Sequence, residues 1–258
     1  MLGPVVIEQP TWGQVEPEVL ASLVVVSPHF DDAILGTSHL LMRHPSSTVI
    51  TVFGGRPARY PEQPGPWDSA GGFVSGDDVV AARQEEDRRA MEVVEARPVW
   101  LDFVEHQYLE PADRPAAEDI VPALASAVTA AGATAVFLPM GLANPDHGTA
   151  HDAGLLAREL LSGLAWFCYE DAGYSQLPGL LAWRVSKLFR SGLWPTPALV
   201  PQVTDAERKR RAIWCYASQI PPLEAEHALS PRLEANSGEQ YWRLAPPPSG
   251  WEALADVP

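Results

Sequence analysis

Three features of the 258-residue sequence predict a single α/β domain with a layered architecture and a mostly parallel sheet. Short apolar runs rich in β-branched residues alternate with stretches of helical periodicity. These runs are apolar at successive positions, which is typical of strands that are covered on both faces. The hydrophobic content of 46% is ordinary for a globular protein, and the chain is long enough to bury one large core.

The first half of the chain predicts three strands and two helices. Asp77-Asp78 is expected to cap the second helix at its N-terminus. Within that helix, the charged run from Arg83 to Arg89 is expected to form a solvated face with i, i+4 ion pairs. In order, the elements are a strand at 22–27, a helix to about residue 43, a strand at 48–53, a helix to about residue 95 and a strand at 98–103.

The second half continues the alternation, so residues 1–258 are treated as one domain. Residues 1–21 are expected to form an N-terminal arm. Segments 56–76 and 175–203 are predicted to be loops that contact the substrate, because long loops inside a compact domain are often functional. The predicted elements are a helix at 116–131, a strand at 133–139, a helix to about residue 161, a strand at 164–169 and a helix from residue 205 to about 218.

Composition narrows the class of partner and the compartment. The formal net charge of −15 argues against nucleic acid or an anionic membrane as a general partner. The two cysteines form neither a disulfide framework nor a Cys-x-x-Cys metal site, which suits a reducing compartment. The sequence shows no signal peptide and no apolar stretch long enough to span a bilayer. We therefore expect a soluble cytoplasmic protein that acts on a small molecule, and self-association into a homo-oligomer is left open.

A polar turn follows the first predicted strand. It contains His29, Asp31 and Asp32, at the place where open α/β sheets carry their ligand sites. His29 and Asp32 lie three residues apart, so both can reach one ion, and imidazole with carboxylate suits zinc. Asp31 is then free to handle a proton. The alternative is that one of the two aspartates only caps the following helix.

A second polar segment, Asn144-Pro145-Asp146-His147, follows the fourth predicted strand. The carboxyl ends of parallel strands share one edge of a sheet, so this segment and the first turn can converge. His29, Asp32 and His147 would then form a three-ligand site with an open position for water, which is the pattern of catalytic zinc. Zinc lowers the pKa of such a water towards ~7 and polarises a carbonyl, and Asp31 would carry the proton.

These two segments resemble the motifs Ala-His-Pro-Asp-Asp-Glu and His-Pro-Asp-His of the PIG-L/LmbE-like zinc-dependent N-deacetylases. The resemblance implies a Rossmann-like, LmbE-like fold and one mononuclear zinc site. It also implies removal of an N-acetyl group from an amino-sugar-containing small molecule, such as an N-acetylglucosamine derivative. Other segments that resemble the family are Arg83-x-x-Glu86-Asp87, Leu101-Asp102-Phe103 with Tyr108, residues 169–174, residues 209–219 and Glu239-x-Tyr241-Trp242.

Carried over by position, the resemblance implies a role for five residues of the two motifs. His29, Asp32 and His147 would bind zinc. Asp31 would be the general base. Asp146 would act from outside the coordination sphere, either by orienting a ligand or by tuning its neighbour.

Three further side chains are candidates for contact with substrate. Arg83 is expected either to reach substrate hydroxyls or to form a surface salt bridge with Glu86 or Asp87. His106 follows the third strand and is expected either to point into the pocket or away from it. His151 lies four residues after His147, so it is either a helper on the same helix face or a solvent-facing histidine.

Three positions depart from the family motifs. Phe30 replaces a proline, Ala33 replaces a glutamate, and Asn144 stands where many members have a histidine. The Asn144 amide can donate a hydrogen bond to an oxyanion but cannot supply a proton. Two other functions therefore stay open: an amidase for a larger N-acyl or thiol conjugate, and a weakened family member that binds a glycoside.

Overall fold

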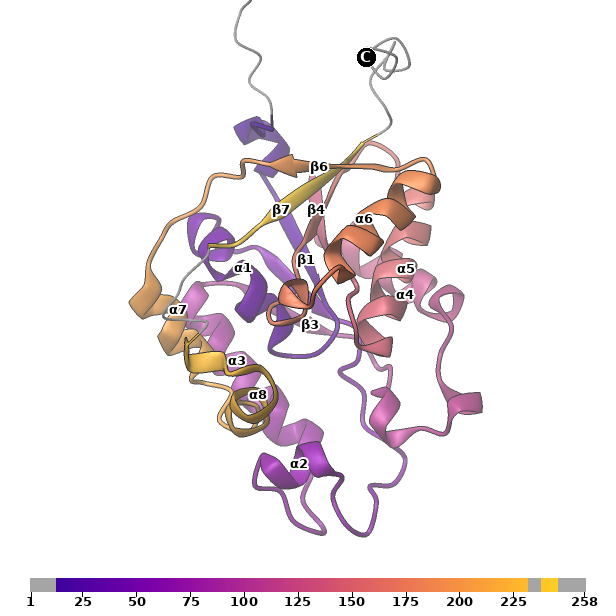
Figure 1. The fold of residues 1–258 in the computed structure, drawn as a ribbon, viewed down its shortest axis with the longest axis vertical. Coiled ribbons are helices and arrows are strands. Elements are labelled where there is room, and N and C mark those ends of the chain that lie inside the picture. Colours follow the sequence, from indigo (N-terminus) through magenta and orange to yellow (C-terminus); the bar gives the residue numbers. More distant parts are fainter. Residues whose placement is uncertain (1–12, 232–237, 246–258) are drawn as a thin grey trace, which may run out of the picture.

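The computed structural model describes residues 13–231 and 238–245, and this part of the chain forms one seven-stranded sheet (Figure 1). The strand order is β3-β2-β1-β4-β5-β7-β6. The first five strands in the chain are parallel, whereas β7 is antiparallel to both of its neighbours. The strands are β1 (Leu23–Ser27), β2 (Thr48–Thr51), β3 (Arg97–Trp100), β4 (Ala135–Pro139), β5 (Ala165–Tyr169), β6 (Trp194–Ala198) and β7 (Tyr241–Ala245).

Helices cover both faces of the sheet (Figure 1). One apolar cluster packs α1, α3 and α7 on one face, and a second cluster packs α4, α5 and α6 on the other. In β1, Val25 belongs to the first cluster while Val24 and Val26 belong to the second, as the alternation of side chains along a strand requires. The helices are α1 (Asp32–Arg43), α2 (Pro66–Ala70), α3 (Val79–Val94), α4 (Ala117–Ala130), α5 (Pro145–Leu160), α6 (Leu180–Arg190), α7 (Ala206–Ile213) and α8 (Ile220–His227).

The predicted α/β architecture is confirmed, and its topology places the candidate site. The chain builds the sheet outward from β1 through β2 to β3, and then returns to add β4 on the other side of β1. The strand order therefore reverses between β1 and β4. Such a switch point opens a crevice at the carboxyl ends of the two strands, where ligands bind in open α/β sheets.

Segment 175–203 is not the loop that its composition suggests, and this part of the prediction is wrong. It contains α6 and the edge strand β6, which pairs with β7 in antiparallel register. Pro195 and Pro197 made this segment resemble a loop, but proline is tolerated on an edge strand because the missing N–H leaves no ladder bond unmade. Segment 56–76 is mostly irregular and contains only α2. Most of the predicted arm, residues 1–12, lies outside the described residues.

The charged run on α3 is also different from the prediction. Asp78 caps the helix as expected, accepting the N–H of Ala81 at 3.1 Å. However, Arg83, Glu86 and Asp87 are buried, with 2%, 7% and 0% of their surface exposed. The reason is that α3 packs against α1, α7 and β3, so one face of this helix has no access to solvent.

Within the part of the chain that the structure describes, every helix is too short or too polar to cross a membrane.

Candidate active site at the carboxyl ends of β1 and β4

The three predicted ligands converge at the switch point. His29 and Asp32 follow β1, and His147 lies in the first turn of α5 after β4. Asp32 Oδ2 is 3.2 Å from His29 Nδ1 and 3.2 Å from His147 Nε2. One donor atom from each residue lies within 4.8 Å of the other two, which is close enough for one metal ion.

Each histidine of this set is held by a carboxylate behind it. His147 Nδ1 is 2.5 Å from Asp171 Oδ1, and His29 Nε2 is 3.0 Å from Asp146 Oδ2. Carboxylates in this position fix the tautomer and orientation of metal-binding histidines. Asp146 thus contacts one candidate ligand, His29, and is not part of the three-residue cluster; its role outside the coordination sphere stays a prediction. Asp171 was missed, although it lies in the 169–174 segment that resembles the family.

The electrostatics of the cluster suit a cation. Although burial alone would lower the pKa of His147, the carboxylates of Asp32 and Asp171 raise it to about 9. Burial has the same effect on His29, but hydrogen bonds to Asp146 and Asp32 raise its pKa well above the usual value. The cluster therefore attracts positive charge. Its two imidazoles and one carboxylate form a donor set that is compatible with zinc.

Asp31 lies next to the candidate ligand Asp32 in the sequence, and its side chain does not cap the helix. It occupies the N-cap position of α1, yet its side chain accepts no capping hydrogen bond. The carboxylate of Asp32 instead accepts the backbone N–H of His29 at 2.9 Å, so the alternative of a simple cap is wrong. Burial and the charge of Asp32 raise the pKa of Asp31 to about 7.

A cavity of about 240 Å³ opens onto the cluster. His29, Asp31, Asp32 and His147 all line it. The remaining wall combines polar side chains with aromatic rings and comes from α2, α3, α8 and the loops after β3 and β5. Its members beyond the motif residues include Trp67, Arg83, Glu105, His106, Gln107, Tyr174, Gln219, Leu223 and Glu226.

Residues 24–158 match the sequence model of the PIG-L family, described as GlcNAc-PI de-N-acetylase. The match spans just over half of the 258 residues and includes all three candidate ligands. The chain belongs to the PIG-L family. Membership makes the protein a hydrolytic N-deacetylase, as the resemblance of its motifs predicted.

Solved structures of PIG-L-like deacetylases share the fold. The zinc-inhibited form of teicoplanin deacetylase has a TM-score of 0.72 at 22% identity, over 89% of this chain and 100% of its own. The A40926 pseudoaglycone deacetylase gives 0.67 at 24% identity, over 88% and 98%. N,N'-diacetylchitobiose deacetylase from Pyrococcus horikoshii gives 0.55 at 18% identity, over 88% and 84%. No curated protein sequence matches this chain.

Asn144, which departs from the PIG-L motif, is the N-cap of α5. Its Oδ1 accepts the N–H of Asp146 at 2.8 Å, as asparagine commonly does at this position. A second hydrogen bond joins its side chain to Tyr174, whose ring packs edge-on against His147 at 5.3 Å. Asn144 thus places Asp146 and His147 at the start of the helix, with its amide at the cavity wall.

Arg83 lines the cavity but has partners that the sequence did not suggest. Its guanidinium lies 2.7 Å from Asp68 Oδ1 and 3.4 Å from Glu105 Oε1. The predicted alternative of a surface salt bridge with Glu86 or Asp87 is wrong, because Arg83 is buried and its guanidinium pairs with Asp68 and Glu105 instead. The predicted contact with substrate hydroxyls stays a prediction.

His106 is at the cavity, as one of the two alternatives required. It starts a short 3₁₀ helix, His106–Tyr108, after β3. Its Nδ1 is 2.9 Å from Asp146 Oδ2, and its backbone N–H donates to the same oxygen at 3.1 Å. Asp146 therefore holds the metal-site residue His29 and the cavity residue His106 at once.

His151 is brought neither to the cavity nor to solvent, so both predicted alternatives are wrong. It is completely buried, and its Nδ1 lies 2.8 Å from the carbonyl oxygen of Pro139. Residues four apart share a helix face only approximately, and α5 turns His151 towards the sheet while His147 reaches the site. Burial and the charge of Arg184 lower the pKa of His151 to about 3.

The burial of His151 predicts that the free energy of unfolding depends on pH. Between about pH 6.5 and 3 the unfolded chain binds a proton at His151 that the folded chain does not, so acid destabilises the fold. His151→Asn keeps a donor for the Pro139 carbonyl but does not titrate. We expect the difference in free energy of unfolding between wild type and variant to shrink by about 1 kcal/mol as the pH falls from about 6 to about 5. Urea unfolding measures it, and a constant difference would contradict the prediction.

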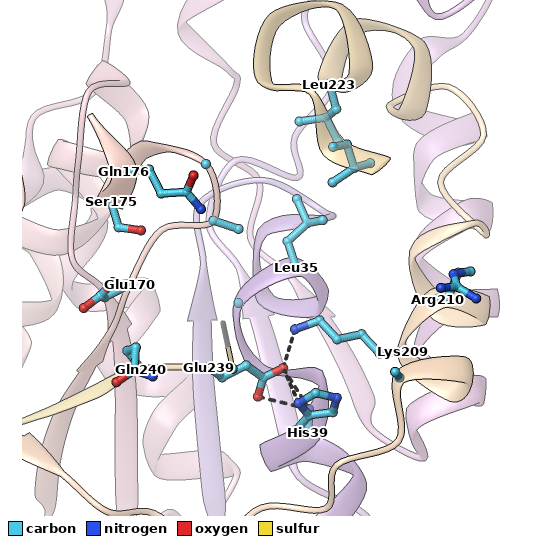
Figure 2. A pocket seen from close by; sticks show the side chains of 16 residues that line it. Leu35, His39, Glu170, Ser175, Gln176, Lys209, Arg210, Leu223, Glu239 and Gln240 are labelled. Carbon is cyan, nitrogen blue, oxygen red and sulfur yellow. Dashed lines mark hydrogen bonds and ion pairs between the residues drawn. The ribbon is translucent and has the colours of Figure 1, made fainter. Parts of the chain in front are cut away.

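A second cavity, of about 130 Å³, lies between α1, α7 and the residues that precede β7 (Figure 2). Here α1 is interrupted at Thr37, and Glu239 accepts the backbone N–H groups of His39 and Leu40, at 2.9 and 3.3 Å. Figure 2 shows Lys209 and His39 against the same carboxylate. This cluster caps the second half of α1, and none of the candidate metal ligands lines the cavity.

Proposed function

We propose that this protein is a zinc-dependent N-deacetylase that removes the acetyl group from an amino-sugar-containing small molecule. The observation that carries the proposal is the convergence of His29, Asp32 and His147 beside the buried carboxylate of Asp31. Three protein ligands would hold one zinc ion and leave a position open, as catalytic zinc sites do. Bound there, zinc would lower the pKa of a water molecule and polarise the substrate carbonyl.

Asp31 is the group to which we assign the first proton transfer. Its side chain lines the cavity and is not occupied by helix capping. A pKa of about 7 is suited to a general base that works near neutral pH. Asp31 takes the proton of the attacking water, and the carbonyl carbon becomes tetrahedral. The Asn144 amide at the cavity wall is the side-chain donor that we assign to the oxyanion.

His106 is the group that we assign to protonation of the departing amine. The family histidine at position 144 is absent here, and His151 is too far inside the core to replace it. His106 lines the cavity, and its Nδ1 is 2.9 Å from Asp146 Oδ2, so this carboxylate orients the ring. When His106 donates its other ring proton to nitrogen, the C–N bond breaks and acetate and a free amine are released.

This role predicts a substrate-dependent loss in His106→Gln. We expect kcat for an N-acetylated amino sugar to fall by about 10²-fold, because its basic amine leaves only when protonated. The loss should be much smaller for N-acetyl-p-nitroaniline, whose amine needs little help. Zinc content should stay at the wild-type level. Equal losses for the two substrates would show that His106 does not donate this proton.

The walls of the cavity support an amino-sugar substrate. Arg83 and Glu105 offer charged donors and acceptors for hydroxyl groups, while Trp67 and Tyr174 offer ring faces for the C–H surface of a sugar. Trp67 is held in place, since its Nε1 donates to Gln219 at 2.8 Å. Proteins that share this fold are described as deacetylases of teicoplanin, of A40926 pseudoaglycone and of N,N'-diacetylchitobiose, which supports the same class.

An acetate-release screen tests the proposal. Zinc-loaded protein is incubated with N-acetylated monosaccharides, aminoglycosides and glycopeptide intermediates, and free acetate and free amine are quantified. We expect release in equal amounts, loss of activity with a chelator, and recovery on addition of zinc. No release from any member of the panel would contradict the proposal.

The same panel separates the two other functions. Preferential cleavage of octanoyl over acetyl amides, or of thiol conjugates, would identify an amidase for larger groups. Saturable binding of a glycoside without turnover would identify a binding protein. For localisation we propose the cytoplasm, since Cys168 and Cys215 are both free thiols.

A further inference from the structure

A buried carboxylate on α3, that of Asp87, is connected by hydrogen bonds to the turn of residues 29–32, which carries two candidate metal ligands and is called the metal-binding turn below. Asp87 is completely buried and accepts one hydrogen bond on each oxygen. Tyr216, which follows α7, donates its hydroxyl to Oδ1 at 2.7 Å. Trp100, the last residue of β3, donates its Nε1–H to Oδ2 at 2.7 Å. Asp87 therefore joins three segments that are distant in the sequence.

Both partners of Asp87 lead to the same residue, Phe30. The Tyr216 hydroxyl has one proton and lies within hydrogen-bonding distance of two acceptors, Asp87 Oδ1 at 2.7 Å and the backbone oxygen of Phe30 at 2.9 Å, which share it in a bifurcated hydrogen bond. The Trp100 ring packs edge-on against the Phe30 ring, with centroids 6.2 Å apart. Tyr216 therefore contacts the main chain of Phe30, and Trp100 contacts its side chain. Phe30 in turn lies between His29 and Asp31 in the sequence.

Burial of the Asp87 carboxylate costs free energy, and an apolar side chain could fill the same space without that cost. The two donors are neutral, so the buried charge of Asp87 is not offset by a direct salt bridge with either of them, and burial raises its pKa to about 6. At position 30 the family motif has proline, whose ring fixes φ and stiffens the turn. Phe30 lacks that restraint, and the contacts from Tyr216 and Trp100 act on the same residue.

We infer that Asp87, Tyr216 and Trp100 are positioning residues that hold the turn of Phe30, and with it Asp31, at the metal site. None of the three lines the cavity. Their effect is to restrict the backbone between a ligand and the proton carrier, because a misplacement of about 1 Å at such a group can cost about 10²-fold in rate. The kinetic consequence rests on the proposed deacetylase function, whereas the rigidity of the turn does not.

Tyr216→Phe isolates the hydroxyl, and Tyr241→Phe is its matched control. Tyr241 is also buried, and its hydroxyl donates to a buried carboxylate, Glu239, at 2.7 Å. Both variants lose one phenol-to-carboxylate hydrogen bond and keep the ring. Only Tyr216 contacts the metal-binding turn.

Hydrogen–deuterium exchange reads the turn without an activity assay. In the full-length protein, we expect the peptide that spans residues 28–34 to exchange about tenfold faster in Tyr216→Phe than in wild type, and at the wild-type rate in Tyr241→Phe. Equal exchange of this peptide in the two variants would overturn the inference. A protein that releases no acetate would contradict the proposed function, and this exchange measurement would still decide the positioning role.

Kinetics provide the second measurement. In Tyr216→Phe we expect kcat to fall about tenfold or more with KM and zinc content unchanged, and in Tyr241→Phe we expect kcat to stay at the wild-type value. If Tyr216 acts through Asp31, adding Tyr216→Phe to Asp31→Asn should cause no further loss. A kcat in Tyr216→Phe equal to that of Tyr241→Phe, or a full additional loss in the double variant, would overturn the inference.

Discussion

Asp31→Asn is expected to retain zinc and to lower kcat by about 10²–10⁴-fold, the range that general acid–base catalysis supplies. The amide has the same shape as the carboxylate but cannot take the proton of the attacking water. Asp31 is not one of the three side chains whose donor atoms converge, so metal binding should survive. Zinc per protein and acetate release, measured on the same preparation, check both parts.

The matched control is Asp113→Asn. It makes the same chemical change at an exposed aspartate in the 3₁₀ helix Pro111–Asp113, outside the cavity. We expect wild-type zinc content and wild-type kcat in this variant. If Asp31→Asn deacetylates as fast as the control, the assignment of Asp31 as the proton carrier is wrong.

His147→Ala is expected to remove both the metal and the activity. The site would keep two ligands of three, and zinc affinity should fall by more than the 10–100-fold that is typical for loss of an outer hydrogen bond to a ligand. Dialysis against a competing chelator, followed by metal analysis, measures this loss. Added zinc should restore chelated wild type but not the variant.

Asp171→Asn should give an intermediate result. It leaves all three ligands in place but replaces the carboxylate that lies 2.5 Å from His147 Nδ1. We expect zinc affinity to fall by about 10–100-fold, with activity recovered at high zinc concentration.

For the preceding variant, His147→Ala, full retention of zinc would show that the metal binds elsewhere.

Local sequence patterns were sufficient to predict the parallel strands. The side chains of β1, β2, β4 and β5 are apolar on both faces of the sheet, so they can be buried only between two layers of helices. The same reasoning failed for β6, where two prolines hid an edge strand. An edge strand is defined by its neighbour β7, which lies more than 40 residues further along the chain, and no local pattern contains that information.

The outcome for individual side chains follows the same division. Arg83, Glu86 and Asp87 have the composition of an exposed helical face, but packing of α3 against α1, α7 and β3 buries them. His151 has the spacing of a site residue, but its place on α5 turns it into the core. Spacing along a helix determines which residues share a face, whereas only the packing of that helix determines what the face meets.

The sequence by itself determined the α/β class, the position of the two polar turns at strand ends, and the identity of His29, Asp32 and His147 as one candidate metal set. These depend on short-range periodicity and on the chemistry of residue types. Only the tertiary structure decided the carboxylates behind each histidine, the partners of Arg83, and the link from Asp87 to Phe30. Those contacts join residues 13 to 186 positions apart, and their formation depends on which faces the folded core buries.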